Sequence, residues 1–369
     1  MYRKLANGII AVAINVSLCI SLAQAENVTI IDTEGRSVEA PMGAKRILLG
    51  FYFEDFYAIG GPDAYENVVA ISRAVWQGWR QSQWKQYSKK DSRLEKLIDV
   101  GEVDSGTFSV ETAIAAKPDV AIFAAWQFRS LGNSIDKLEE SGIPVVVIDY
   151  NAQTLEKHVT STQILGKITN NEKRAEQLAS EYSNAVQDVW QRVKKAGGDP
   201  KRVYVELGNK GSQEYGNTYS NTMWAGVVQQ AGGKNIGDGQ VEKWGPLNPE
   251  YVIASNPQAI FIAGSDWVGK SKAVLMGFDE KPEVTRARLQ PYVERAGWNN
   301  FEGVKNGEVH ALYHGGARTL YDYTFLQYIA KVLHPEAFSD VDPVENHRQF
   351  YEKYLPIDAN GVFMIKLEK

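Results

Sequence analysis

The sequence has few of the residues that most often hold metals or act as nucleophiles. Its 369 residues include one cysteine and five histidines. A single cysteine excludes an intramolecular disulfide and a zinc site built from thiolates. The motifs HExxH and GxSxG do not occur, and the histidines lack zinc-ligand spacing. A Ser/His/acid triad has no support in the pattern, so we expect neither catalysis nor a resident cofactor.

Long apolar runs are also scarce. The longest mostly apolar stretch, 9–22, lies within the first 25 residues. Two basic residues precede it, and Ala-Gln-Ala at 23–25 follows as a small-x-small cleavage site, which is the pattern of a secretory signal peptide. We therefore expect cleavage before Glu26 and a mature chain in the periplasm.

Two other interpretations of residues 1–25 stay open. A membrane anchor needs about 20 apolar residues to cross a bilayer, and this run is shorter. A lipoprotein signal would place the lipid on Cys19, but Leu18 stands where that signal normally has Gly or Ala. After cleavage the chain would contain no cysteine, and hence no thiol nucleophile.

Basic residues are fewer than acidic residues. The formal net charge is −5, and it becomes −7 without the two basic residues of the first 25. Such a protein is not attracted to the phosphates of nucleic acids. Beyond the first 25 residues, no segment is long and apolar enough to predict a membrane span.

What the chain does have is one internal repeat. Residues 111–124 and 250–263 match at a constant offset of 139. Five positions are identical: Glu111/Glu250, Ile114/Ile253, Ala115/Ala254, Pro118/Pro257 and Ala124/Ala263. Each copy predicts a short helix that ends near the proline and is followed by a buried strand. The spacing is too long for a solenoid, so the repeat indicates two similar lobes with a ligand held between them.

Strand and helix patterns alternate in both halves of the chain, which is typical of parallel α/β units. Apolar runs predict strands at 28–31, 47–49, 67–71, 120–124, 145–148, 202–207, 260–263 and 309–312. Periodic patterns predict helices at 110–116, 134–141, 154–168, 172–196, 223–231, 281–296 and 321–333. The helix at 172–196 would be about 37 Å long, which suits a connection between lobes.

These patterns predict an α/β fold of two Rossmann-like lobes, each with a parallel sheet. We expect a signal peptide at 1–25, an N-terminal lobe at 26–170, an interdomain helix at 171–197 and a C-terminal lobe at 198–369. Because the connection is helical, we expect limited hinge motion.

Several short motifs, in their order and spacing, carry a family resemblance. They are Val28–Asp32, Gly35-Arg36, Lys45–Ile47, Val100–Glu102, Glu111–Asp119, Ser141–Val145, Ala231–Ile236 and Asn306–Val309. With them the chain resembles the periplasmic substrate-binding proteins of ABC importers for iron–siderophore complexes, haem and vitamin B12. The resemblance covers roughly residues 28–333, and it implies two lobes bridged by a long helix with the ligand in the cleft.

The resemblance also implies a docking role for the two repeated glutamates. In this family a surface Glu on each lobe is thought to engage Arg residues of the permease, and Glu111 and Glu250 occupy the matching positions. Two distant carboxylates on one face can fix the orientation of a partner. The alternative is that each Glu only favours its own helix dipole.

The loops after the predicted strands are rich in aromatic and basic residues, and such loops meet the ligand in Rossmann-like lobes. The candidate ligand-binding residues are Phe51, Trp76, Trp79, Arg80, Trp126, Arg129, Tyr215, Trp244, Tyr313, His314 and Arg318. Arginines can pair with anionic oxygens, and aromatic rings can pack on a chelate. Trp244 stands six residues before Glu250, where the resemblance implies a cleft tryptophan. Core packing is the alternative for each single aromatic residue.

Two features of these loops stay open. Tyr313 and His314 are candidates for direct metal ligation where a siderophore leaves coordination sites free, although a plain cleft or surface histidine is the alternative. The basic and aromatic segment around Trp76–Tyr87 is either a lid over the cleft or an insertion packed on the first lobe.

One segment matches a nucleotide-binding motif without being interpreted as one. Residues 264–271 fit the phosphate-loop pattern after a strand. However, Asp266 and Trp267 stand where phosphate would lie, and the protein is expected outside the cytosol. We therefore interpret this segment as a cleft loop.

Together these features predict a monomeric periplasmic receptor that captures a ferric siderophore and delivers it to an inner-membrane ABC permease dimer. Haem, cobalamin or a nickel/cobalt chelate is the alternative cargo on the same fold. A chelatase-like enzyme and a ligand sensor that signals to a membrane partner are the alternatives from other classes.

Overall fold

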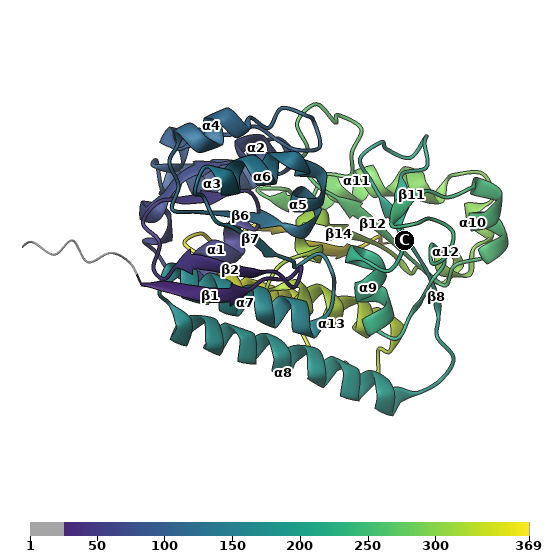
Figure 1. Ribbon diagram of the computed structural model, residues 1–369. Coiled ribbons are helices and arrows are strands. Elements are labelled where there is room, and N and C mark those ends of the chain that lie inside the picture. The colour runs from purple at the N-terminus through teal and green to yellow at the C-terminus, as the bar shows by residue number, and fades with distance from the viewer. Residues whose placement is uncertain (1–25, 369) are drawn as a thin grey trace, which may run out of the picture.

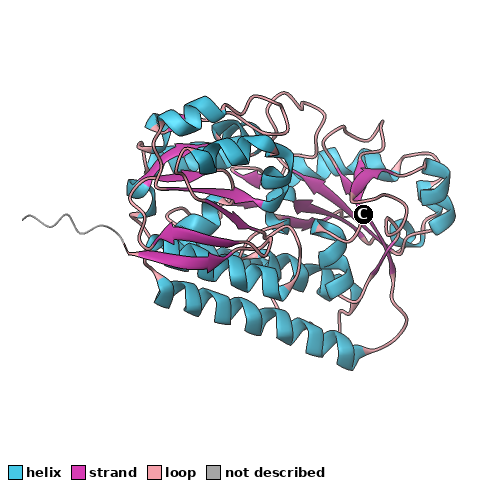
Figure 2. Cartoon of the chain, viewed as in Figure 1, coloured by secondary structure: helices cyan, strands magenta, loops and turns pink. Residues whose placement is uncertain are grey.

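Two five-stranded sheets, one in each half of the chain, organise the fold (Figures 1 and 2). The computed structural model describes residues 26–368. Figure 2 shows helices packed around both sheets, and the long helix α8 runs along one side of the whole molecule. The predicted two-lobed α/β fold is confirmed.

The sheet of the N-terminal lobe is parallel throughout, in the order β5-β4-β3-β6-β7. Its strands are β3 (Ile47–Leu49), β4 (Val68–Ile71), β5 (Ile98–Asp99), β6 (Val120–Ala124) and β7 (Val145–Ile148). Strands β3 and β6 and the edge strand β7 are buried along their whole length. Both of their faces are covered, which is why they are continuous apolar runs in the sequence.

The sheet of the C-terminal lobe has the order β10-β8-β12-β14-β16. Its strands are β8 (Arg202–Leu207), β10 (Lys234–Asn235), β12 (Ala259–Gly264), β14 (Val309–Tyr313) and β16 (Met364–Lys366). The first four are parallel, whereas β16 pairs with β14 in the antiparallel direction. Three antiparallel ribbons lie outside the two sheets: β1 (Asn27–Ile31) with β2 (Ser37–Pro41), β9 (Asn217–Tyr219) with β11 (Trp244–Pro246), and β13 (Gly277–Phe278) with β15 (Gly361–Val362).

Most helices connect successive strands. In the first half they are α1 (Phe53–Gly60), α2 (Arg73–Trp79), α3 (Gln81–Lys90), α4 (Val110–Ala115), α5 (Ala125–Leu131), α6 (Asn133–Glu140), α7 (Leu155–Thr169) and α8 (Glu172–Ala196). In the second half they are α9 (Met223–Gln230), α10 (Pro249–Ser255), α11 (Pro282–Val293), α12 (Glu302–Lys305), α13 (Asp322–Leu333) and α14 (Pro343–Tyr354). The segment around Trp76–Tyr87 thus forms α2 and α3, and α14 is a helix that the sequence patterns did not predict.

Helix α8 joins the lobes, with the bounds that the sequence predicted. It packs on α7 and α1 in the N-terminal lobe and on α13 in the C-terminal lobe. Its buried face consists of apolar residues at three- and four-residue steps: Ala175, Leu178, Ala179, Tyr182, Val186 and Val189. A rigid rod of this kind fixes one side of the boundary between the lobes (Figure 1).

The sequence repeat is a structural repeat. The first copy forms α4 and β6, and the second forms α10 and β12. The residues before the two prolines, Lys117 and Asn256, both have left-handed backbones, with φ of 49° and 43°. Since a proline disfavours a helical conformation in the residue before it, the two helices end within one residue of the same point of the repeat.

Candidate functional site

Loops from the carboxyl ends of strands in both sheets meet where the lobes adjoin. Phe51 follows β3, Trp126 follows β6, and their ring centroids are 5.6 Å apart. Arg318, which follows β14 and the short 3₁₀ helix His314–Ala317, lies with its Cζ 4.9 Å from the centre of the Phe51 ring. This contact brings residues of both lobes together at the place where parallel α/β sheets bind ligands.

Two arginines form the centre of this cleft. Arg80 lies between α2 and α3, and its Cζ is 5.6 Å from the same Phe51 ring. Arg80 is 5% exposed and Arg318 is 6% exposed. Among residues 26–368, no ion pair joins either guanidinium to a carboxylate, and Nε of Arg318 is buried without a hydrogen-bond partner. Two nearly buried cations without a paired anion form a site suited to a negatively charged ligand.

The pKa values reflect this arrangement. Burial, together with repulsion from Arg80, lowers the pKa of Arg318 to about 10. Burial also acts to lower the pKa of Arg80, but Tyr313, Tyr321 and Glu54 outweigh it, so that the pKa is raised. Both side chains therefore carry their charge at neutral pH.

Aromatic rings and further hydrogen-bond donors surround the arginine pair. Trp79 stacks on Trp126 with centroids 6.2 Å apart, and the Cζ of Arg318 lies 5.8 Å from the Trp79 ring. The hydroxyl of Tyr313 and Nε1 of Trp126 are buried and have no hydrogen-bond partner. The cleft thus offers donors and flat apolar surfaces, which is a suitable lining for the oxygen atoms and rings of a chelate.

His314 has a definite tautomer here. Its Nδ1 lies 3.4 Å from Nε1 of Trp224 and 3.4 Å from the hydroxyl of Tyr219. Burial, with the guanidinium groups of Arg318 and Arg80, lowers the pKa of His314 well below its ordinary value. An indole N–H only donates, so Nδ1 accepts and the neutral ring carries its proton on Nε2. Direct metal ligation by His314 stays a prediction, and this tautomer disfavours it.

Directly behind Arg80 lies a buried carboxylate that the sequence analysis missed. Glu54, in α1, is 2% exposed and accepts hydrogen bonds from the hydroxyls of Tyr87 (2.8 Å), Tyr321 (2.6 Å) and Tyr351 (2.8 Å). Burial raises the pKa of Glu54, although these hydroxyls and Arg80 oppose the shift. Because Tyr321 and Tyr351 belong to the C-terminal half, Glu54 ties the two lobes together.

The neighbouring Asp55 makes a second tie. Its Oδ1 accepts a hydrogen bond of 2.7 Å from the backbone N–H of Leu320. Burial raises the pKa of Asp55 to about 8, against the opposing effect of this N–H. The only sequence signal for the pair was two adjacent acidic residues inside an otherwise aromatic helix, Phe53–Tyr57.

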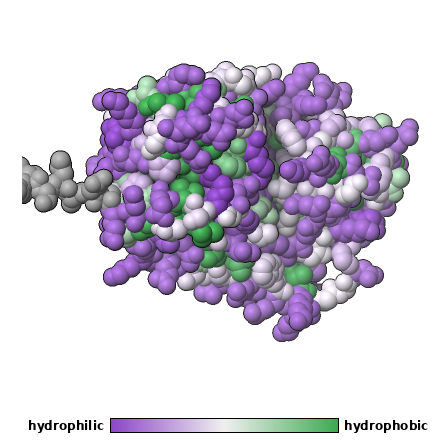
Figure 3. Space-filling view, viewed as in Figure 1, coloured by the Kyte–Doolittle hydropathy of each residue, from purple (hydrophilic) through white to green (hydrophobic). Residues whose placement is uncertain are grey.

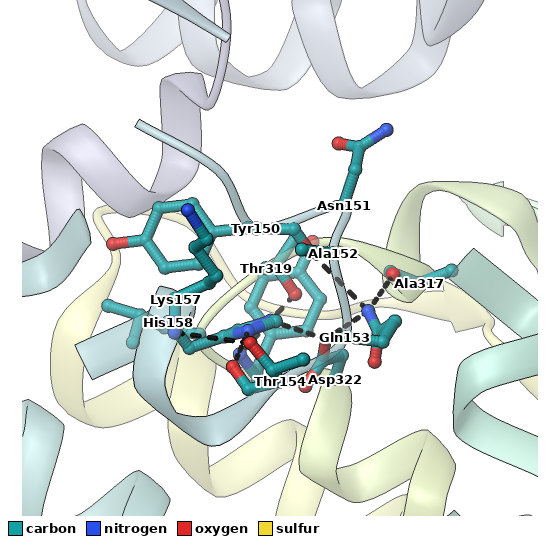
Figure 4. Close-up of polar contacts among 12 residues, drawn as sticks. Tyr150, Asn151, Ala152, Gln153, Thr154, Lys157, His158, Ala317, Thr319 and Asp322 are labelled. Carbon is teal, nitrogen blue, oxygen red and sulfur yellow. Dashed lines mark hydrogen bonds and ion pairs between the residues drawn. The ribbon is translucent and has the colours of Figure 1, made fainter. Parts of the chain in front are cut away.

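A third tie lies between α7 and α13 (Figure 4). Nε2 of His158 is 3.0 Å from Oδ2 of Asp322, and both side chains are almost completely buried. Nε2 of Gln153 donates to the same carboxylate oxygen at 2.9 Å, and it also donates to the carbonyl of Ala317. Burial acts to lower the pKa of His158, but Asp322 outweighs it and the pKa is raised.

The structure places four of the predicted cleft residues outside this cluster. Trp76 is fully buried and stacks on Phe53 at 4.5 Å, so it belongs to the core. The other three are Arg129, which is exposed and paired with Glu34; Tyr215, whose ring lies against Arg295 and whose hydroxyl accepts from Nε1 of Trp298; and Trp244, which is 61% exposed. The structure brings together Phe51, Trp79, Arg80, Trp126, Tyr313, His314 and Arg318.

The centre of the cleft is closed to solvent in this structure. Figure 3 shows a furrow between the lobes on the face drawn. The arginine pair lies below the surface, because contacts across the boundary cover it. Residues 264–271, which fit the phosphate-loop pattern, lead into turns and then β13, whereas a phosphate loop leads into a helix.

The two repeated glutamates lie at corresponding surface positions. Glu111 is exposed in the first turn of α4, and Glu250 is exposed in the first turn of α10. In the part of the chain that the structure describes, no helix is long and apolar enough to span a bilayer, and no group of three or more His, Cys, Asp or Glu side chains is placed to hold a metal ion.

Two parallel-sheet lobes, one long connecting helix and an aromatic, cationic cleft between them define the class of two-lobed solute-binding proteins. Residues 47–313 match the model of a family described as "Periplasmic binding protein". The chain belongs to this family, as the resemblance implied.

Solved structures and curated relatives agree. The TroA-like periplasmic binding protein FepB from Veillonella parvula matches with a TM-score of 0.86 and 31% identity, over 92% of this chain and 100% of that one. The vitamin B12-binding protein BtuF of Vibrio cholerae has a TM-score of 0.58 at 20% identity, over 80% of this chain and 99% of that one, and so shares the fold.

Among curated proteins, a vitamin B12-binding protein of Pectobacterium atrosepticum is 26% identical over 52% of this chain and 66% of its own length. An uncharacterized ABC transporter substrate-binding lipoprotein of Bacillus subtilis, YvrC, is 24% identical over 77% of both chains. The chain thus spans just under two thirds of the first relative, and both relatives are named as binding proteins.

Proposed function

We propose that this protein captures an anionic ferric siderophore complex and delivers it to an ABC permease of the inner membrane. The observation that carries the proposal is the nearly buried guanidinium of Arg318, which no carboxylate of the described residues pairs, beside a second nearly buried arginine, Arg80, that only Glu54 behind it helps to compensate. Burying a charge is costly unless a partner compensates it, so the ligand is expected to supply the missing negative charge.

The aromatic lining supports a chelate rather than a small inorganic anion. Phe51, Trp79 and Trp126 contact one another around the arginines and can pack on the rings of a catecholate complex. The siderophore itself supplies hard oxygen ligands to Fe(III), so the protein needs only to recognise the charge and shape of the complex.

Cobalamin is the second candidate because curated relatives are vitamin B12-binding proteins. Its corrin rim carries uncharged amides and its only anionic group is one phosphodiester, so cobalamin offers Arg80 and Arg318 less negative charge than an anionic ferric complex does. Charge therefore favours the anionic ferric complex. Haem has two carboxylates and is the intermediate candidate by this criterion.

Intrinsic fluorescence titration tests the cargo. The purified protein is titrated with ferric catecholates, ferric hydroxamates, ferric citrate, haemin and cobalamin, each beside its metal-free form. We expect tight quenching by an anionic ferric complex and no Soret band from a haem-ligated histidine. Tight binding of cobalamin alone, or no response to any ferric complex, would refute the proposal.

Delivery is tested separately. Replacing Glu111 and Glu250 together by Arg is expected to abolish uptake in cells and leave ligand affinity unchanged. Glu283→Arg is the matched control, because Glu283 is also exposed in the first turn of a helix, α11, but lies outside the repeat. Normal uptake by the double variant would remove the docking role.

A further inference from the structure

A loop of the C-terminal lobe reaches across the boundary beside the arginine pair. We call residues 266–272 the gate loop; they lie between β12 and β13. Its two ends are held close together, because the N–H of Ser265 donates to the carbonyl of Val274 at 3.0 Å. The N–H of Val274 in turn donates to Gly208 at 2.9 Å, in the C-terminal sheet region. The loop thus projects from a fixed base, in the manner of an Ω-loop.

The gate loop and its base bond to the residues that flank Arg80. We call residues 73–90, which form α2 and α3, the strap. The N–H of Val268 donates to the carbonyl of Gly78 at 2.9 Å, and the hydroxyl of Ser265 donates to the carbonyl of Trp79 at 3.0 Å. On the other side of Arg80, the carboxylate of Asp266 accepts from the N–H of Ser82.

The strap is firmly packed on the N-terminal lobe. Trp76 is fully buried, stacks on Phe53, and donates from Nε1 to Gln83 at 2.7 Å. Tyr87 is also fully buried and donates to Glu54. A segment with two such anchors is expected to move with its lobe.

The gate loop is held far more lightly. Val268 is 54% exposed, and Gly269 has a left-handed backbone with φ of 76° and open space where a Cβ would stand. Residues 268–272 are all exposed. Few buried contacts and exposed backbone hydrogen bonds are the marks of a segment that opens locally at low cost in free energy.

The gate loop also covers the cleft. The ring of Trp267 lies 5.7 Å from the ring of His314, in the same cluster as Arg318. Moving the loop would therefore uncover the donors of the cleft and release the backbone on both sides of Arg80 at the same time.

Separation of the lobes is the other conceivable route of entry, and the structure opposes it. Glu54, Asp55 and Asp322 each make buried bonds across the boundary, and α8 packs on both lobes. Opening along this side would break several buried hydrogen bonds to charged groups, each of which contributes about 1.5–3 kcal/mol net.

We propose that the gate loop moves to open the cleft while the strap stays fixed on the N-terminal lobe. In this proposal Asp266 is the residue that positions Arg80 toward a bound ligand. Ligand enters and leaves between Val268 and Gly78, while the Glu54 side of the boundary stays closed. The binding arm of the test rests on the proposed function, whereas the exchange arm needs no ligand.

A reversible disulfide between the gate loop and the strap tests whether movement of the loop admits the ligand. Gly78→Cys with Val268→Cys, in a Cys19→Ser background, joins the two segments by a disulfide. The backbone hydrogen bond between Val268 and Gly78 keeps their Cα atoms within roughly the 4.4–6.8 Å that a disulfide spans, and a Cβ on Gly78 meets open space. We expect the oxidised protein to bind and to release an anionic ferric catecholate at least about tenfold more slowly than the reduced protein.

The affinity, as the ratio of the two rates, is expected to change far less. The reduced double variant and both single variants are the controls, and reductant should restore the rates. Unchanged rates in protein whose disulfide is verified by mass would overturn the proposal.

Asp266→Asn tests the positioning role. It is expected to weaken the bond to Ser82, to speed release of the anionic ferric ligand severalfold, and to affect the binding of cobalamin less, because its phosphodiester is the only anionic group that cobalamin offers to Arg80. Asp279→Asn is the matched control, since Asp279 accepts from Gln86 at the outer end of the strap at 2.8 Å. Equal effects of the two variants would assign Asp266 a merely structural role.

Hydrogen exchange without ligand completes the test. The amides of Val268 and Ser82 are expected to exchange much faster than that of Leu320, which donates to Asp55. The disulfide of the oxidised double variant should protect only the first two. Equal exchange at all three sites would show that the lobes open as a unit and refute the gate, whereas failure of ferric complexes to bind the wild-type protein would refute the cargo alone.

Discussion

Two polar clusters lie at the boundary between the lobes, and they are built in opposite ways. Around Glu54, the carboxylate has three hydroxyl donors and faces the positive charge of Arg80. Around Arg318, a guanidinium has aromatic rings as neighbours, a buried Nε without a partner and a second cation nearby. Burial is similar in the two clusters, but only the first has its charge compensated by the protein.

The difference assigns the clusters different roles. A buried charge with a complete set of partners holds a structure together, and removing one partner is costly. A buried charge without partners is a cost that a ligand can relieve. Each prediction below changes one side of this comparison.

The largest effect is expected at the compensated side. Glu54→Leu removes the acceptor of three buried tyrosine hydroxyls and the negative charge behind Arg80. We expect the free energy of unfolding to fall by about 3–5 kcal/mol, measured by denaturant titration. Glu54→Gln keeps an acceptor oxygen and should lose less. A loss below about 1 kcal/mol in Glu54→Leu would mean that this cluster does not hold the lobes together.

The next effect is expected in the cleft and has the opposite character. Arg318→Met removes an unpaired cation and keeps the volume, so stability should stay the same or rise. Affinity for an anionic ferric complex should fall about 100-fold, which corresponds to about 2.7 kcal/mol. Calorimetric titration and thermal unfolding measure the two quantities.

Arg129→Met is the control for that variant. Its guanidinium is exposed and already paired with Glu34, so neither affinity nor stability should change by much. Wild-type affinity in Arg318→Met would break the comparison, because the uncompensated cation would then have no ligand to bind.

A smaller, pH-dependent effect is expected at His158. Because its pKa is raised in the folded protein, its ion pair with Asp322 contributes fully below the unfolded pKa of about 6.5 and is lost as the pH rises through the folded pKa. Asp322→Asn should therefore lower the free energy of unfolding by about 2 kcal/mol at pH 6 and by less at pH 9. Unfolding titrations across this range measure the difference. A deficit that grows with pH would contradict the assignment of a charged His158.

The two lobes were predictable from the sequence because their evidence is local. The repeat that contains Glu111 and Glu250, and the apolar runs of the parallel strands, each lie within a few consecutive residues. The helix at Glu172–Ala196 has a regular apolar face and glycines just after its end. Patterns of this kind follow from backbone geometry and burial alone.

The cleft was predictable only in part. Phe51, Trp126 and Arg318, which lie together in the structure, were predicted as ligand-binding residues because they follow strands of parallel sheets. Trp76 was not separable from Trp79 by pattern, since the two are three residues apart on one helix and only packing shows that the first is in the core. The pairing of His158 with Asp322 depends on two residues 164 positions apart, and nothing local marks it.

The smallest effect is expected at the rim. Trp244 is 61% exposed on β11 and lies opposite Tyr219 of β9, whose hydroxyl is 3.4 Å from Nδ1 of His314. A side chain that remains largely in water contributes little to affinity, so Trp244→Ala should weaken ligand binding by less than about threefold. Trp126→Ala, inside the cleft, is the comparison variant and should cost more. A loss of more than about tenfold in Trp244→Ala would place the ligand against the outer ribbon, away from the arginines, and the contrast between the two buried clusters would then no longer explain recognition.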